Sequence, residues 1–305
     1  MPTAANTGCL LRLDCFFRAM TPPNSPLFTR LSGWLQGGAI RVERLRAVHS
    51  PELGNRRTIT VYLPPGYTHD REFPLLIAHD GQEMNAWKLS DALRQHHAAG
   101  HVTPIVATIP ANADRMHEYG TAGRLNSQGL GSRAAEFQLF VTDTVVPLLR
   151  RRYQVSRRPA HTAVMGASLG GLSAFDLAWR RPDLFGAVGV FSGSFWWRTS
   201  NASVAEQQAS RIAHQLVREN AARPALRLWF QAGTHDEQDD RDGNGVIDAI
   251  QDTTELIDEL ATKGFNVGRD VVYHQTDGGI HHPSTWAREL PAFLRWAFPE
   301  PQFLP

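Results

Sequence analysis

The sequence predicts an α/β fold in which a mostly parallel central sheet carries helices on both faces. Short, continuous apolar runs, such as residues 73–78 and 226–230, are typical of parallel strands that are covered on both sides. Longer amphipathic stretches separate these runs, as expected when helices connect the strands of one sheet. One strand-to-helix junction, at residues 162–180, also contains the pattern Gly-x-Ser-x-Gly, which places a serine at the turn.

The individual elements follow in chain order. Apolar and polar residues alternate at residues 40–48 and 57–63, which predicts two half-buried strands. Buried strands are expected at residues 73–78, 105–109 and 226–230, and further strands at residues 162–165, 187–191 and 271–274. Helices are expected at residues 89–99, 132–153, 169–180, 201–220, 253–262 and 283–298, the second of them with Ser132 as its N-cap.

The predicted domain organisation is simple. Residues 1–38 are rich in proline and glycine and are expected to form a loosely structured N-terminal extension. Residues 39–305 contain all the predicted strands and are expected to form one catalytic domain. No chemistry is visible in the extension, so the search for a site concentrates on the domain.

Composition excludes several classes of function. The chain has 305 residues, is 42% hydrophobic and carries a formal net charge of +1, so its charge predicts no attraction to nucleic acid or membrane. No apolar run is long enough to span a membrane, and residues 10–17 are interrupted by Arg12 and Asp14, which makes a poor signal peptide. Only Cys9 and Cys15 are cysteines. A cytoplasmic protein is therefore expected, and its oligomeric state is not determined by the sequence.

The serine at the junction is the first candidate catalytic residue. A short strand, a Gly-x-Ser-x-Gly turn and a helix together predict a nucleophile elbow with Ser168 at its apex. Gly166 and Gly170 keep side chains out of the crowded turn. The start of the following helix favours negative charge through its unpaired N–H groups and its dipole, and Leu169 contributes the first of these groups.

A second backbone donor is expected in the loop after the strand at residues 73–78. That strand ends in His79-Asp80-Gly81-Gln82. In a fold with a nucleophile elbow, this loop usually supplies one N–H group of the oxyanion hole. The candidates are Gln82 or Gly81, together with Leu169. The alternative is a glycine turn without a catalytic role.

The acid and the base of a triad are expected after later strands. Asp236 follows the strand at residues 226–230 and is the preferred acid, with Glu237 and Asp239 as alternatives. His281 follows the last strand and is the preferred general base, with His282 as its rival. The chain order Ser168, Asp236, His281 is the order that this type of serine hydrolase uses.

Two segments are candidates for a substrate pocket. Trp196 and Trp197 lie in a loop directly after a predicted strand, where pocket walls are often built, although core packing is an equal alternative. The long polar stretch at residues 111–132 contains Arg115 and Tyr119 and is expected to form a wall of the cleft. A solvated surface loop is the alternative for this stretch.

An acidic loop after the triad acid matches part of a calcium-binding motif. Residues 240–248 fit nine positions of a calcium loop, with side-chain oxygens from Asp240, Asp242 and Asn244, the carbonyl of Val246, and Asp248. Gln251 replaces the glutamate that an EF-hand places at position twelve. The sequence therefore predicts a structural Ca²⁺ site, with an acidic surface turn as the alternative.

With these residues in place, the chain resembles the putative esterase (esterase D-like) family of α/β-hydrolases, and its enterochelin esterase branch most of all. The matching segments are residues 79–82, 165–171 and 192–197, Arg115 with Glu118 and Tyr119, and Gly279-x-His281 with Trp286 five residues on. The resemblance implies an α/β-hydrolase fold and a serine esterase; family members include siderophore, feruloyl and acetyl-sugar esterases. His282 stands where similar sequences often have asparagine, and residues 1–38 are too short for the β-rich domain of many siderophore esterases.

The expected function is hydrolysis of a small-molecule carboxylic ester through an acyl-enzyme intermediate, without an organic cofactor. An acyltransferase on the same scaffold differs only in using an alcohol in place of water. A catalytically silent binding protein with this fold is the third alternative, and the complete triad order argues against it.

Overall fold

The computed structural model describes residues 38–299. The chain divides into two units, residues 1–38 and 39–305, and the elements below belong to the second. The extension predicted for residues 1–38 lies outside the described residues, apart from Gly38 itself.

An eight-stranded sheet forms the centre of the described unit, with the order β1-β2-β4-β3-β5-β6-β7-β8. The first two strands are antiparallel to their neighbours, and all pairs from β4 to β8 are parallel. The carboxyl ends of β3 to β8 therefore meet at one edge. The strands are β1 (Arg41–Ser50), β2 (Asn55–Leu63), β3 (Leu75–Ala78), β4 (Ile105–Thr108), β5 (Thr162–Ala167), β6 (Ala187–Phe191), β7 (Arg227–His235) and β8 (Val271–Ile280).

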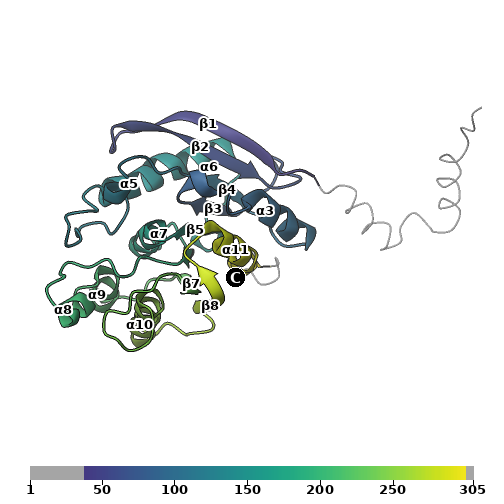
Figure 1. The fold of residues 1–305 in the computed structure, drawn as a ribbon. Coiled ribbons are helices and arrows are strands. Elements are labelled where there is room, and N and C mark those ends of the chain that lie inside the picture. Colours follow the sequence, from purple (N-terminus) through teal and green to yellow (C-terminus); the bar gives the residue numbers. More distant parts are fainter. Residues whose placement is uncertain (1–37, 300–305) are drawn as a thin grey trace, which may run out of the picture. The chain divides into compact units, whose positions relative to one another are not determined.

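Helices cover both faces of this sheet, as the sequence predicts (Figure 1). The helices are α3 (Leu89–Ala98), α4 (Arg115–Glu118), α5 (Ala134–Leu139), α6 (Val146–Arg152), α7 (Leu169–Arg180), α8 (Val204–Ala209), α9 (Ile212–Glu219), α10 (Asp248–Thr262) and α11 (Pro283–Ala297). Helices α3 and α11 pack together over one face. Helices α5, α6, α7, α9 and α10 contribute to the core on the other. Short helical segments add η1 (Gly81–Glu83), the π-helical η2 (Phe140–Val145) and η3 (Pro159–His161).

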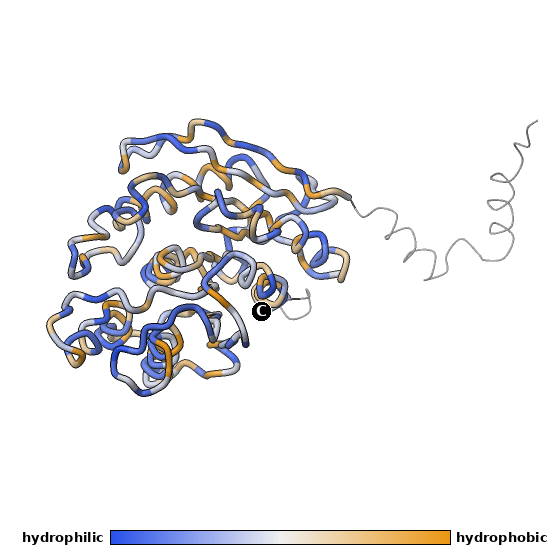
Figure 2. Tube along the Cα trace, viewed as in Figure 1, coloured by the Kyte–Doolittle hydropathy of each residue, from blue (hydrophilic) through white to orange (hydrophobic). Residues whose placement is uncertain are grey.

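The core has two parts because side chains alternate along each buried strand. In β3, Leu75 and Ile77 enter one cluster, whereas Leu76 and Ala78 enter the other. All four residues are fully buried. Figure 2 shows the complementary pattern on the helices, whose traces alternate between hydrophilic and hydrophobic residues. A strand that is apolar on both sides is thus explained by two apolar helical layers.

Three boundaries differ from the sequence predictions. Strand β8 extends to Ile280 instead of ending near residue 274, because its backbone remains paired with β7 as far as the pair His235–Ile280. Helix α10 begins at Asp248, five residues earlier than predicted. Ser132 is not the N-cap of α5, which begins at Ala134; its hydroxyl instead contacts the ring of His117.

Two predicted helices are also interrupted. The helix predicted for residues 132–153 contains the π-helical η2 between α5 and α6. The helix predicted for residues 201–220 is two helices, α8 and α9. Among residues 38–299, no helix has the length and apolar character needed to cross a membrane.

Candidate active site

The turn between β5 and α7 places Ser168 at the carboxyl edge of the sheet. Ser168 has φ 55° and ψ −129°, a backbone conformation that residues with a side chain rarely adopt. A Cβ on Gly166 would lie only 2.3 Å from the carbonyl oxygen of Gly170, so this turn requires glycine. A strained serine between a buried strand and a helix has the geometry of a nucleophile elbow.

The hydroxyl of Ser168 faces the loop after β6. Its Oγ lies 3.3 Å from Oγ of Ser194, and the N–H of Ser194 donates to the carbonyl oxygen of Ser168. Within residues 38–299, no hydrogen bond joins Ser168 to His281. Sequence analysis did not single out Ser194; its signal was the block Ser-Gly-Ser-Phe-Trp-Trp directly after the strand.

Asp236 follows β7 and is buried, with 7% of its surface exposed. The N–H of Gly233 donates to its Oδ2 at 2.8 Å, whereas its buried Oδ1 has no hydrogen bond of good geometry among the described residues. Burial raises the pKa of the Asp236 carboxyl; the Gly233 N–H, the Ser192 hydroxyl and His281 oppose this rise. Asp236 and His281 are therefore electrostatic neighbours.

The two alternative acids have different surroundings. Burial raises the pKa of Glu237 to about 7; the N–H of Ala249 opposes this rise, while Asp248 and other nearby carboxylates add to it. His281 is not among the groups that shift Glu237. Asp239 is exposed. The electrostatic surroundings thus favour Asp236 as the partner of the histidine.

His281 directly follows β8, and its ring meets the ring of Trp286 edge-on, with centroids 5.4 Å apart. Partial burial lowers the pKa of His281 from its ordinary value of 6.5, Asp236 raises it, and Arg115 lowers it further. The residue keeps an exposed surface. A neutral imidazole at neutral pH follows from this lowering, and a general base must be neutral.

His282 has a structural task in the same segment. It is the N-cap of α11, and its Nδ1 accepts the N–H of Ser284 at 3.2 Å. The hydroxyl of Ser284 lies 2.9 Å from the same nitrogen. Because its Nδ1 is occupied at the helix end, His282 is less suited than His281 to proton transfer.

The ends of β7 and β8, which lead to Asp236 and His281, approach each other closely at two glycines. A Cβ on Gly233 would lie 2.4 Å from the carbonyl oxygen of Gly279, and a Cβ on Gly279 would lie 3.0 Å from Cα of Gly233. This backbone approach brings Asp236 and His281 together, and a side chain at either position would separate them.

The loop after β3 contains the second candidate oxyanion donor. The N–H of Gly81 donates to the carbonyl oxygen of Ile109, so it is occupied. This leaves Gln82 as the better candidate in the loop. The side chain of Gln82 spans the loop: Nε2 donates to Asp80 at 3.1 Å and Oε1 accepts the N–H of Ala111 at 2.9 Å. Leu169 is the first residue of α7, where N–H groups lack helical partners.

Arg115 and Tyr119 hold the loop after β3 in place through hydrogen bonds to Asp80. The guanidinium of Arg115 donates two hydrogen bonds of 2.8 Å to the carboxylate of Asp80. The hydroxyl of Tyr119 accepts the N–H of Asp80 at 3.1 Å, and its ring stacks on that of His79. Tyr119 is fully buried, so the structure places it in the core, whereas sequence analysis placed it at the substrate. Arg115 remains half-exposed.

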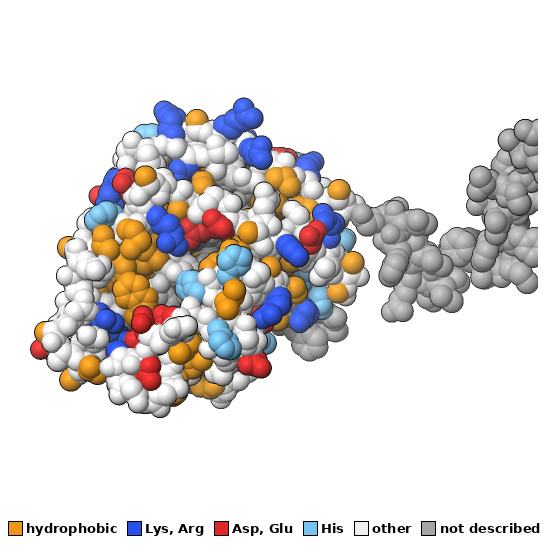
Figure 3. Space-filling model, in the orientation of Figure 1, with side chains coloured by type: hydrophobic (Ala, Val, Ile, Leu, Met, Phe, Trp, Pro, Cys, Tyr) orange, Lys and Arg blue, Asp and Glu red, His pale blue; other side chains and the backbone are white. Residues whose placement is uncertain are grey.

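The two adjacent tryptophans separate into different environments. Trp197 is fully buried, and its ring packs against Gly120, which favours the core-packing alternative for this ring. Trp196 keeps 36% of its surface exposed and lines a cavity of about 500 Å³. On the face shown in Figure 3, histidine, acidic and basic side chains surround a hollow in the middle of the view. The cavity beside Trp196 is lined in addition by Arg198, Gln207, Glu237, Asp239, Asp240, Arg241 and Asp248.

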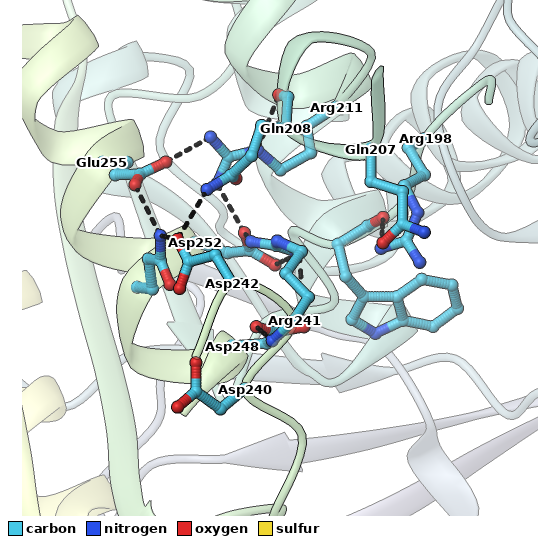
Figure 4. Close-up of polar contacts among 12 residues, drawn as sticks. Arg198, Gln207, Gln208, Arg211, Asp240, Arg241, Asp242, Asp248, Asp252 and Glu255 are labelled. Atoms are coloured by element: carbon cyan, nitrogen blue, oxygen red, sulfur yellow. Dashed lines mark hydrogen bonds and ion pairs between the residues drawn. The ribbon is translucent and has the colours of Figure 1, made fainter. Parts of the chain in front are cut away.

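The predicted calcium loop uses its oxygens internally. Asp240 accepts the N–H groups of Asn244 and Gly245, and Asn244 accepts that of Val246. Asp242 accepts side-chain amides from Gln208 and Gln251, while Asp248 pairs with Arg241. Figure 4 shows Arg241 and Arg211 among the carboxylates of Asp248, Asp252 and Glu255. No group of three or more His, Cys, Asp or Glu side chains in the described range is arranged to hold a metal ion. The calcium site stays a prediction.

Comparison with known proteins supports the fold and the chemistry. Residues 50–297 match the sequence model of a family described as putative esterase. The YbbA protein of Bacillus subtilis (strain 168) is 25% identical over 252 residues, which cover 80% of this chain and 93% of YbbA. An iron(III) enterobactin esterase of Dickeya dadantii (strain 3937) is 35% identical over 149 residues, 48% of this chain and 32% of that esterase.

Solved structures of esterases share the architecture. A ferulic acid esterase superposes with a TM-score of 0.65 at 18% identity, covering 85% of this chain and 98% of that one. The enterobactin esterase of Shigella flexneri, solved in the presence of 2,3-dihydroxy-N-benzoyl-serine, gives 0.62 at 22% identity, covering 86% and 62%. These likenesses establish the α/β-hydrolase fold.

Proposed function

The chain belongs to the putative esterase family and hydrolyses carboxylic esters, and we propose that it does so through Ser168, His281 and Asp236. The observation that carries the proposal is their placement after β5, β8 and β7, whose carboxyl ends share one edge of the sheet. Ser168 stands on a strained turn, and the strands that lead to Asp236 and His281 approach closely at two glycines.

In the proposed reaction, His281 accepts the hydroxyl proton as Ser168 attacks the ester carbonyl. The hydroxyl must rotate away from Ser194 towards the imidazole, a small adjustment because catalytic hydrogen bonds often tighten only with substrate. Asp236 stabilises the imidazolium, while the N–H groups of Leu169 and Gln82 donate to the oxyanion. His281 then returns the proton to the leaving alcohol.

Water completes the cycle. It attacks the acyl-serine, His281 again takes the proton, and the acid is released as Ser168 regains its hydrogen. No organic cofactor takes part in these steps. We propose a small-molecule ester as the substrate, with the exposed face of Trp196 contacting the part of it that lies outside the reacting bond.

The test is hydrolysis of p-nitrophenyl acetate by the Ser168→Ala variant. We expect a fall in kcat of roughly 10³- to 10⁶-fold with an unchanged fold, because triad members act as a unit. Ser173→Ala, which alters a buried serine on the same helix, is the matched control and should keep its activity. Substantial turnover by a pure, folded Ser168→Ala protein would overturn the proposal.

A further inference from the structure

A chain of contacts links helix α11 to the acid of the proposed triad. The indole Nε1–H of Trp286, in the first turns of α11, donates to Oγ of Ser192 at 2.9 Å. Ser192 in turn lies beside Asp236, whose pKa its hydroxyl lowers. The same indole ring contacts the ring of His281 edge-on. Trp286 therefore touches the base directly and reaches the acid through one serine.

The indole is held firmly in this position. Trp286 is 7% exposed and packs against Trp87, with ring centroids 5.3 Å apart. The backbone around it is fixed as well, because Oγ1 of Thr285 accepts the N–H of Ile280 and His282 caps the helix. A donor on a side chain held in this way has a defined direction.

The position of Ser192 is also fixed by its surroundings. It follows β6 with φ 47°, a conformation that costs of order 1–3 kcal/mol for a residue with a side chain. Its N–H donates to the carbonyl oxygen of Gln231 at 2.7 Å, and the residue is 2% exposed. The surrounding structure maintains this conformation, and the Ser192 hydroxyl is a neighbour of the Asp236 carboxyl.

The direction of the hydrogen bonds follows from chemistry. An indole N–H can only donate, so Oγ of Ser192 must accept from Trp286. The hydroxyl proton of Ser192 is then free to point elsewhere. Oδ1 of Asp236 is buried and has no other hydrogen bond of good geometry among the described residues, so it is the acceptor at hand.

We propose that Trp286 and Ser192 are positioning residues that orient the carboxylate of Asp236 towards His281. This inference rests on the proposed function. Trp286 fixes the rotamer of Ser192, Ser192 holds one oxygen of Asp236, and the Gly233 N–H holds the other. The carboxylate then has one favoured orientation, in which it raises the proton affinity of the imidazole.

The experiment compares Trp286→Phe, Ser192→Ala and the double variant on p-nitrophenyl acetate over a pH range. Each single change should lower kcat about tenfold to a hundredfold, the factor that corresponds to one hydrogen bond to a charged group, while KM stays nearly constant. The double variant should be no slower than Ser192→Ala, because both changes break the same chain of contacts.

The pH profile supplies a readout that packing alone would not move. Asp236 raises the pKa of His281 and Arg115 lowers it. A carboxylate that is no longer held should therefore let the acid limb move to lower pH. Trp229→Phe is the matched control: Trp229 is also buried, on the strand that leads to Asp236, and its Nε1 has no hydrogen-bond partner among residues 38–299. It should leave kcat and the acid limb unchanged.

Two results would overturn the inference. Wild-type kcat and an unmoved acid limb in Ser192→Ala would do so even if Trp286→Phe does not fold. Losses that multiply in the double variant would show that the two residues act separately. Ser168-dependent hydrolysis combined with either result overturns this inference alone, whereas hydrolysis independent of Ser168 overturns the proposed function with it.

Discussion

Two aspartates that follow strand β7, Asp236 and Asp240, have carboxylates in opposite environments. Asp236 is buried with Oδ1 lacking a hydrogen bond of good geometry among residues 38–299, next to His281. Asp240, four residues later, accepts two N–H groups of its own loop. The carboxylate of Asp236 lies near a histidine that titrates, whereas the carboxylate of Asp240 stabilises the conformation of its own loop.

The difference indicates where function is located. A buried carboxylate oxygen that no backbone N–H satisfies is unfavourable, so it persists where another requirement maintains it. Asp236 has such an oxygen, with the Ser192 hydroxyl and His281 nearby, whereas Asp240 stabilises a turn. The abundance of acidic residues in residues 240–248 is by itself a weaker sign of chemistry than the single carboxylate before them.

Replacing each of the two adjacent histidines by alanine should give the largest difference in kcat. We expect His281→Ala to lower kcat by roughly 10³-fold or more, because the base is lost. His282→Ala should keep most activity and lose about 1 kcal/mol of stability, the typical value of an N-cap. Steady-state kinetics and thermal unfolding of both purified variants test this. An inactive His282→Ala beside an active His281→Ala would move the base to His282.

The pH dependence should separate the Asp236–His281 pair from the carboxylates of the loop at residues 240–248. The pKa of His281 is lowered from 6.5, so its neutral, active form persists below that pH. We expect kcat/KM to fall only as the pH drops below 6.5, with an acid limb that Asp240→Asn leaves in place. Rates measured from pH 4.5 to 8, with activity recovered on return to pH 7.5, test this. An acid limb above pH 7 would contradict it.

Adding or removing calcium should have the smallest effect, and it should act on the stability of the fold. If the loop at residues 240–248 binds Ca²⁺, a hundredfold excess over the dissociation constant stabilises the fold by about 2.7 kcal/mol. The ion has to displace loop N–H groups from Asp240, so weak binding is expected. Thermal unfolding after chelation and after adding Ca²⁺ measures the shift, with Asp240→Asn as the control. Identical melting curves in every state would reduce the loop to an acidic turn.

Much of the fold could be predicted because a buried strand appears in the sequence as a continuous run of apolar residues. Residues 73–78 are apolar throughout, and the structure covers β3 on both sides. The last strand was underestimated because Gly278 and Gly279 read as a loop. Backbone pairing with β7 continues through these residues, and hydrogen bonds across strands leave no trace in a local pattern.

The site could be predicted in part, and for a physical reason. The elbow around Ser168 is formed by consecutive residues, so its glycines and its position between a strand and a helix could be recognised in the sequence. The burial of Trp197 and Tyr119 could not be predicted, because it depends on segments far along the chain. Gly120 lies against the ring of Trp197, and the backbone N–H of Asp80 donates to the hydroxyl of Tyr119. Ser192 also escaped notice, since its role depends on Trp286, 94 residues away.

The close approach of Gly233 and Gly279 limits how this enzyme can change. Where two backbones meet so closely, an insertion in one segment displaces the other, so the segments bearing the proposed acid and base must vary as one unit or not at all. If Arg115 and Trp196 contact the substrate as proposed, the loops around them are where its preference can change. A library built to redirect this esterase should therefore diversify those two loops and leave the two glycines intact.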